Sequence, residues 1–194
     1  MSPRIEPGTT RDIGRINAGI TRLLGAATGG PPPNLFTTLA RHRGVFRKWL
    51  RFAGALMPGG RLPRDESELV ILRVAHNTGC EYERRHHERL GAQAGLSPEE
   101  IERVRLGPDA GWSARRAALL QATDELLSET RISDETWNRL RPIYSDEDLI
   151  ELCLLVGHYE MLAMTLNSLE VEPDQPPRRR TRAMRIAERI ANRR

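Results

Sequence analysis

The sequence has little cysteine, few aromatic residues and no long apolar run. Two cysteines, Cys80 and Cys153, in 194 residues exclude a fold built on a framework of disulfides. Aromatic residues make up 5% of the chain, so its core must consist mainly of Leu, Ile, Val and Ala. No apolar run approaches the roughly 20 residues that span a bilayer, and the N-terminus lacks the apolar segment of a secretory signal. We therefore expect a soluble, cytoplasmic protein.

Lysine is almost absent, and the positive charge is unevenly spread. The net charge is +4, yet residues 178–194 hold eight Arg and one Glu, so the rest of the chain is slightly acidic. We interpret residues 175–194 as a solvated basic tail. Binding to nucleic acid or to an anionic membrane, or docking on a neighbouring subunit, is the alternative. No aromatic residue lies among these arginines to stack on bases.

Apolar residues recur at helical spacing, and no sustained alternation indicates a strand. The pattern predicts an all-α fold, a compact bundle of about seven helices. We expect three parts: an N-terminal helix with a Pro-rich connector (1–33), a helical domain (34–174) and the tail (175–194). The most strongly patterned helices are expected at residues 12–27, 66–76, 80–94, 114–129, 134–141 and 146–169.

Several helix boundaries carry capping signals. Ser97-Pro98-Glu99-Glu100 combines an N-cap, a proline at the first position and a glutamate at the third. Asp65 and Glu68 have the spacing of a second capping box, and Gly95 is a plausible C-cap. Ser145 and Asp148 open the last helix. Asn34 can cap a helix over residues 35–42 after Pro31-Pro32-Pro33, and we expect Gly44 to interrupt it before a second piece follows.

The helix expected at 146–169 is apolar on nearly all sides, so we predict that it is largely buried. In a chain of this size such a helix forms either the centre of the bundle or an oligomer interface. Cys153, in its middle, is interpreted as an inert core thiol. His158 lies on the same helix and needs a buried polar partner, so it is a candidate to reach the site described next.

The segment from Glu68 to His87 carries the chemistry, and it reads ELVILRVAHNTGCEYERRHH. At 100° per residue, Cys80, Glu83 and His87 project at about 0°, 300° and 340°, on one helix face. A thiol, a carboxyl and an imidazole on one face can transfer protons or activate a nucleophile. The ionisation of Cys80 stays open, because a helix N-terminus lowers the pKa of a thiol and an ionised Glu83 raises it.

This block, extended to Ile101, resembles the carboxymuconolactone decarboxylase and alkylhydroperoxidase D superfamily. The resemblance continues in the preceding NLFTTLARHRGVFRKWLRF and the later LIELCLLVGHYEMLAMTLNSLEVEPD, so it covers about residues 34–174. The resemblance implies an all-helical oligomer, a dimer, trimer or hexamer. It also implies that Glu68, Cys80 and His87 match the glutamate, first cysteine and histidine of the peroxidase branch. Glu83 occupies the place of the second cysteine, so a disulfide cycle within this motif is excluded. The resulting Cys-Glu-Tyr-Glu is more similar to the decarboxylase branch.

The leading hypothesis is therefore acid–base chemistry on a small organic acid or lactone, without a metal or organic cofactor. Its expected catalytic residues are Glu68, Cys80, Glu83 and His87. The alternatives are a peroxidase-like reaction of Cys80 and a non-catalytic oligomer that binds a ligand.

Each of these residues also has a structural interpretation. Glu68 could serve only the capping box, Cys80 and His87 could be packed core residues, and Glu83 could be a surface partner of His87. His86 is expected to face solvent.

Overall fold

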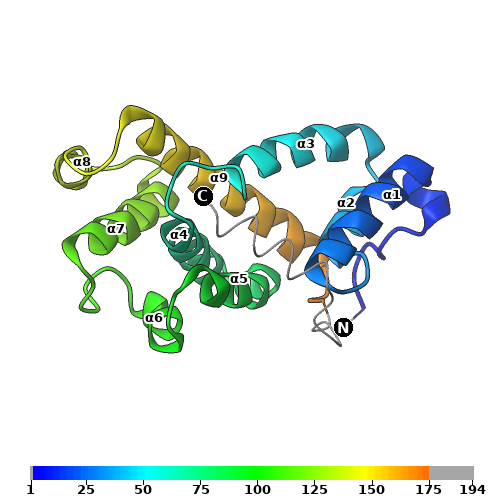
Figure 1. Cartoon of the computed structure of the whole chain (residues 1–194), viewed down its shortest axis with the longest axis horizontal. Helices are drawn as coiled ribbons and strands as arrows, with labels where there is room; N and C mark the ends of the chain where they lie inside the picture. The colour runs from blue at the N-terminus through cyan, green and yellow to red at the C-terminus, as the bar shows by residue number, and fades with distance from the viewer. Residues whose placement is uncertain (1, 175–194) are drawn as a thin grey trace. The chain divides into compact units, whose positions relative to one another are not determined.

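The computed structural model describes residues 2–174 (Figure 1). Within these residues the chain forms nine α-helices, one 3₁₀ turn and no strand. The all-α class is thus confirmed, with more helices than the seven or so expected. The basic tail at 175–194 lies outside the described residues, and the division into 1–33, 34–174 and 175–194 stays a prediction.

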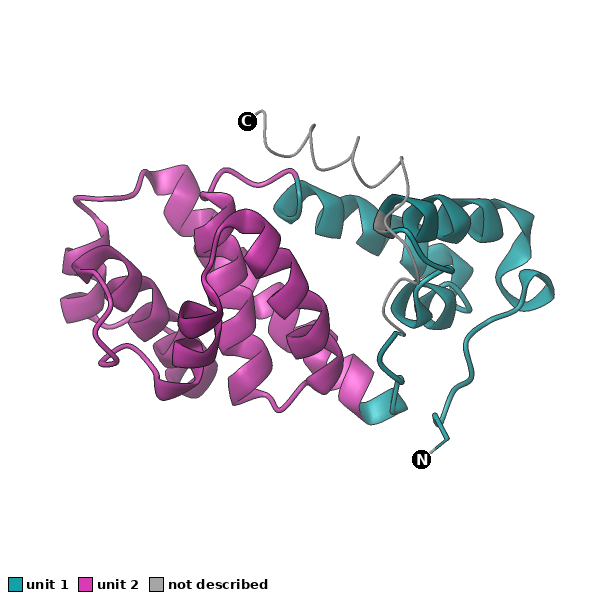
Figure 2. Cartoon of the chain, turned by 60° about the horizontal axis from the view of Figure 1, so that its bottom comes forward, with its two compact units in different colours: residues 1–58, 168–194 teal, residues 59–167 magenta. Residues whose placement is uncertain are grey.

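The chain divides into two compact units (Figure 2). The first comprises residues 1–58 and 168–194, and the second comprises residues 59–167. The first unit contains α1 (Thr10–Thr28), α2 (Asn34–Leu39) and α3 (Arg43–Leu56). Its small core gathers Ile13, Ala18, Ala40 and Phe46, with Trp49 packed against it.

Two details of the first unit differ from the sequence interpretation. Asn34 is the first residue of α2 rather than its cap, because Pro33 takes the N-cap position. The side-chain amide of Asn34 instead donates a hydrogen bond to the carbonyl of Glu172, at 3.0 Å. Gly44 lies inside α3 and does not interrupt it.

The second unit is built around α4 (Arg64–Asn77), whose residues are buried on almost every side. The other elements of this unit are α5 (Glu81–Ala94), α6 (Pro98–Arg103), η1 (Val104–Leu106), α7 (Ala114–Glu129), α8 (Asp134–Leu140) and most of α9 (Asp146–Leu169). Leu69 and Leu72 of α4 meet Leu96, Val104 and Leu120 in one apolar cluster. Packing from several sides makes α4 the central helix of the unit.

A tight turn joins α4 to α5 and sets their pairing. Gly79 has a φ of 61°, a left-handed conformation that glycine adopts at little cost. The amide of Cys80 then donates to the carbonyl of Ala75 at 2.9 Å, which closes the end of α4. Cys80 becomes the N-cap residue of α5. The side chains that follow it on α5 are thereby directed back toward α4.

The capping predictions are confirmed at three helices and wrong at two, α2 and α4. Ser97 and Glu100 form a reciprocal capping box at α6, and Gly95 ends α5 in the left-handed conformation. Ser145 and Asp148 likewise exchange hydrogen bonds at the start of α9. The box expected from Asp65 and Glu68 does not form. Pro63 precedes α4 instead, which frees the Glu68 side chain for the interior.

The last helix, α9, was predicted to be largely buried, and this is only partly correct. It is long and apolar enough to cross a membrane, but 56% of its apolar window is buried inside the fold, as in the core helix of a soluble protein. One stripe of α9 is exposed, and it includes Cys153, which was wrongly interpreted as a core thiol. Within the described residues, no neighbouring element covers this stripe of α9.

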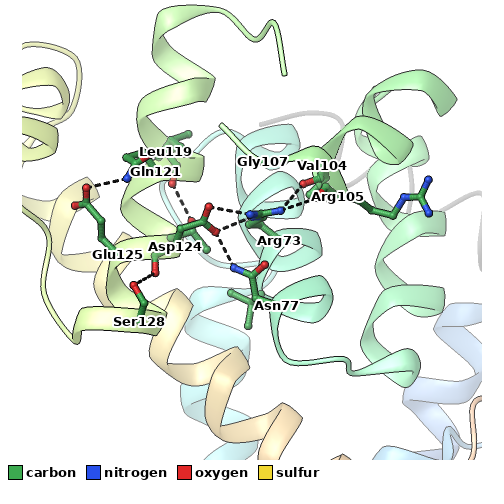
Figure 3. A network of polar contacts seen from close by, with 12 residues as sticks. Arg73, Asn77, Val104, Arg105, Gly107, Leu119, Gln121, Asp124, Glu125 and Ser128 are labelled. Carbon is green, nitrogen blue, oxygen red and sulfur yellow. Dashed lines mark hydrogen bonds and ion pairs between the residues drawn. The ribbon is translucent and has the colours of Figure 1, made fainter. Parts of the chain in front are cut away.

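Arg73 ties the central helix to its neighbours (Figure 3). Its guanidinium donates to both oxygens of Asp124 on α7, at 2.6 and 2.9 Å, and to the carbonyl of Val104 at 2.9 Å. Asn77 donates to the same Asp124 carboxylate at 2.7 Å. The two charged side chains are mostly buried, so this pair is shielded from water and from salt.

We expect Arg73→Ala to lower the free energy of unfolding by about 2–3 kcal/mol, because it leaves the largely buried Asp124 carboxylate without its charged partner and with only the Asn77 amide. Urea denaturation measures this loss. The matched control is Arg85→Ala, which removes an exposed ion pair with Glu81 on α5 and should change stability by about 0.5 kcal/mol or less. Equal losses in the two variants would contradict a special role for Arg73.

Candidate active site

Four side chains singled out by the sequence are buried together in the second unit. Glu68 comes from the middle of α4, Cys80 from the start of α5, and Glu83 and His87 from the first two turns of α5. All four are almost inaccessible to solvent. The α4–α5 turn is what brings the glutamate of one helix against the face of the other. Glu83 is therefore not a surface residue.

The strongest contact in the site joins Glu68 to His87. Nδ1 of His87 lies 2.6 Å from Oε2 of Glu68, a short hydrogen bond between buried groups. A carboxylate can only accept, so Nδ1 carries the proton and donates it to Glu68. In the neutral ring, Nε2 is then the basic nitrogen. This arrangement fixes both the tautomer and the orientation of the imidazole.

Arg64 balances the negative charge of Glu68. One of its terminal nitrogens lies 2.8 Å from Oε1 of Glu68, one helical turn away on α4. The arginine side chain is about one third exposed (37%) whereas the glutamate side chain is fully buried (0%). Arg64 thus links the interior carboxylate to the surface of the unit and reduces the cost of burying a charge.

The thiol of Cys80 is protonated at neutral pH. Burial raises its pKa to about 12, and the neighbouring Glu83 carboxyl adds to the effect. The backbone amides of Glu83 and Tyr82 act in the opposite direction, as expected at a helix N-terminus, but they do not compensate. The two opposing effects that the sequence left open are therefore resolved in favour of the neutral thiol.

The Glu83 carboxyl also holds its proton. Burial raises its pKa to about 8, and the Cys80 thiol beside it only partly counters this. Among the described residues, neither carboxyl oxygen of Glu83 meets a conventional hydrogen-bond partner. A buried carboxyl that is neutral and lacks a conventional hydrogen-bond partner can donate its proton to another molecule that enters the site.

Tyr159 is a site residue that the sequence analysis missed. It lies on α9, and its ring packs edge-on against His87 at a centroid distance of 5.1 Å. Burial raises the pKa of its hydroxyl, and the nearby Glu68 and Glu83 raise it further. Tyr159 therefore closes the site from the side of α9. No motif in the sequence marks it, since it is one aromatic residue in an apolar helix.

Two further histidines, His158 and His86, lie beside aromatic rings of the site. The ring centroid of His158, on α9, is 5.2 Å from that of Tyr159. Burial lowers its pKa to about 4, so its ring is neutral. His86 is partly buried and contacts the His87 ring at 5.3 Å, which corrects the expectation that it faces solvent. In residues 2–174 no group of His, Cys, Asp and Glu side chains has the arrangement of a metal site.

The raised pKa of Glu83 predicts how stability depends on pH. In the unfolded chain Glu83 ionises near the ordinary glutamate pKa of 4.5, whereas in the fold it keeps its proton up to about pH 8. The folded state thus binds more protons across this window, so its stability falls as pH rises.

Glu83→Gln should remove this fall of stability with rising pH. Relative to the variant, the free energy of unfolding of the wild type should decrease by roughly 2–5 kcal/mol between about pH 4.5 and about pH 8. Urea denaturation at several pH values measures the difference, with the exposed Glu102→Gln as control. A constant difference between wild type and Glu83→Gln across the window would show that Glu83 is ionised in the fold.

Known proteins share both the sequence signature and the fold. The carboxymuconolactone decarboxylase family matches residues 43–124, which include all four site residues. No curated protein matches the chain in sequence.

Several solved structures have the same fold. An uncharacterized peroxidase-related protein with an alkylhydroperoxidase AhpD core, from Ralstonia eutropha JMP134, superposes with a TM-score of 0.80 at 19% identity, over 89% of this chain and 93% of that one. A peroxidase-related protein from Silicibacter sp. TM1040 gives 0.75 at 16% identity, over 91% and 92%. The debrominase Bmp8, as a cysteine-to-alanine variant in complex with 2,3,4-tribromopyrrole, gives 0.74 at 13% identity, over 98% of both chains.

Residues 43–124 thus match the carboxymuconolactone decarboxylase family, and the fold of the described residues is similar to that of the AhpD-like structures, as the resemblance implied.

Proposed function

We propose that the protein is an enzyme that carries out acid–base chemistry on a small organic acid, lactone or related carbonyl compound, without an organic cofactor. The observation that supports this most is the hydrogen bond from His87 to Glu68, next to the protonated carboxyl of Glu83. In this arrangement His87 is a base of fixed orientation and Glu83 is an acid. Proton transfer between two atoms of a substrate requires both. We also propose a cytoplasmic location.

In this mechanism Nε2 of His87 removes a proton from carbon next to the substrate carbonyl. Glu68 stabilises the imidazolium that forms, because its carboxylate is already aligned with Nδ1. The neutral carboxyl of Glu83 gives its proton to the developing enolate or leaving group. Arg64, at the exposed end of this chain of contacts, offers a positive charge to a substrate carboxylate.

Replacing the base tests the assignment. His87→Ala should lower turnover of a lactone or keto acid by at least about 100-fold, the usual contribution of a general base. Glu83→Gln should be impaired as an acid but keep its fold, whereas Cys80→Ser should only weaken turnover. His76→Ala, at the exposed end of α4, is the matched control and should keep full activity. Circular dichroism checks that each variant is folded. Full activity in folded His87→Ala would refute this site.

A second candidate is thiol chemistry at Cys80. Two of the structural relatives are described as peroxidase-related, and the debrominase was captured with its brominated pyrrole as a cysteine-to-alanine variant. In the peroxidase reaction the Cys80 sulfur would attack a hydroperoxide, giving a sulfenic acid and an alcohol. Two equivalents of an external thiol would then restore Cys80 and release water and a disulfide. The high pKa of the Cys80 thiol makes this the less favoured candidate.

Reaction with cumene hydroperoxide separates the two candidates. The neutral thiol predicts slow oxidation at neutral pH, read as a mass increase of one oxygen, and the rate should rise with pH toward the pKa of Cys80, about 12. Cys80→Ser controls for the exposed Cys153, which reacts independently. Fast and stoichiometric sulfenic acid at Cys80 at neutral pH would favour the peroxidase and count against the acid–base proposal.

A further inference from the structure

The two units of the chain carry charge of opposite sign. Residues 1–58 hold eight Arg and one Lys against one Glu and one Asp, a net charge of +7. Residues 59–167 hold 13 Arg against 20 acidic residues, a net charge of −7. From Ile13 to Arg64 the sequence contains no acidic residue. The first unit is therefore strongly basic, independently of the tail at 175–194.

The exposed face of α1 combines this charge with large aliphatic side chains. Arg15 and Arg22 are both exposed, and beside them Ile16 and Leu23 are 69% and 74% exposed. A spacing of seven residues puts the members of each pair on the same side of the helix. No carboxylate lies among the exposed side chains of this helix after Arg15. The face is thus basic along one edge and apolar along the other.

The exposed side of α3 repeats this combination. Arg47, Lys48 and Arg51 are exposed, while Val45 and Phe52 are 54% and 42% exposed. The whole helix contains no acidic residue. Two helices of the same unit therefore present cations next to apolar side chains.

Arg43, the first residue of α3, binds this helix to α1. Its guanidinium donates hydrogen bonds to the carbonyls of Arg11 and Asp12, at 3.0 and 2.9 Å. Farther along α3, Phe46 shares the small core of the unit with Ile13 of α1. The two helices thus form one packed body, and their exposed faces are held by the same core.

The composition of these faces selects among partners. Aliphatic side chains that are this exposed favour an apolar partner, and the arginines beside them favour an anionic one. An anionic bilayer offers both, because its acyl chains begin directly beneath the phosphates of its headgroups. Single-stranded nucleic acid also offers phosphates, but its bases stack on aromatic rings, and α1 contains none.

Other parts of the same protein fit these faces less well. Residues 175–194 contain eight Arg and one Glu, so faces of the same sign repel them. The acidic second unit of another copy has the right sign, but several of its carboxylates already pair within that unit. Asp124 pairs with Arg73, and Glu66 pairs with Arg115. These carboxylates have less charge to offer to a neighbouring molecule.

We propose that the exposed faces of α1 and α3 form a docking surface for an anionic lipid bilayer. Ile16 and Leu23 enter the boundary between headgroups and acyl chains, and Arg15 and Arg22 bind the lipid phosphates beside them. The contact is peripheral and reversible, and salt weakens it because its electrostatic part is screened. It is independent of the chemistry at His87.

Flotation of the full chain with lipid vesicles tests this surface. The wild type should bind phosphatidylcholine vesicles that contain about one quarter phosphatidylglycerol, and about 0.5 M salt should release it. It should not bind phosphatidylcholine alone. Arg15→Gln with Arg22→Gln should weaken binding about 10- to 30-fold. Ile16→Ser with Leu23→Ser should weaken it at least about 10-fold.

A matched control removes the same charge elsewhere. Arg85→Gln with Arg105→Gln changes two exposed arginines of the second unit, and this variant should bind vesicles as the wild type does. Circular dichroism should be the same for all variants, because every substituted side chain is exposed. In Leu23→Trp, lipids brominated on their acyl chains should quench the added tryptophan.

Three outcomes would overturn the proposal. Unchanged binding in both double variants of α1 would assign the membrane contact to the tail. Weaker binding in the arginine variant alone, together with capture of a short DNA duplex by the wild type, would identify a surface for polyanions. A wild type that does not float with anionic vesicles would exclude the bilayer, whether or not it forms a salt-sensitive assembly with itself.

Discussion

The hydrogen bond between Glu68 and His87 is the constraint on which the rest of the second unit depends. A fully buried carboxylate is tolerated only when it is paired and hydrogen-bonded, so α5 must place the imidazole of His87 beside Glu68 of α4. The short turn at Gly79 fixes how the two helices align, and Arg64 supplies the compensating charge. The site is therefore part of the packing of the two helices and is held rigid by it.

The same burial that aligns His87 keeps the remaining acids of the site protonated. Glu83 and Cys80 lack the charged partners that Glu68 has, so each keeps its proton at neutral pH. Two carboxyl groups on neighbouring helices thus differ in their surroundings, since Glu68 is paired with charged groups and Glu83 is not. Under the function proposed above, Glu83 serves as the proton donor at the position where the resemblance implies a second cysteine.

Much of this could be predicted from the sequence. Helical periodicity gave the class, and the bounds of α7 and α9 follow from clear caps and apolar spacing. Cys80, Glu83 and His87 were singled out because local spacing places them on one helix face, and Glu68 was added through the resemblance to a family; their catalytic assignment stays a prediction. Tyr159 was missed because it is 72 positions from His87 in the chain, and no local pattern encodes that contact. The capping box at Asp65 failed for a related reason, because the Glu68 carboxylate contacts Arg64 and the distant His87 instead of the start of its own helix.

The exposed side of α9 shows the limit of composition as a guide to burial. A helix that is apolar all round specifies that every side avoids water, but not which neighbour covers each side. Within the second unit, α4 and α5 cover the side of Tyr159, while the side of Gly157 is left uncovered by the described residues. Covering that side needs further surface, and a unit of this size has little to spare. Apolar spacing therefore identifies which sides of a helix avoid water, whereas the tertiary fold decides which of those sides are covered.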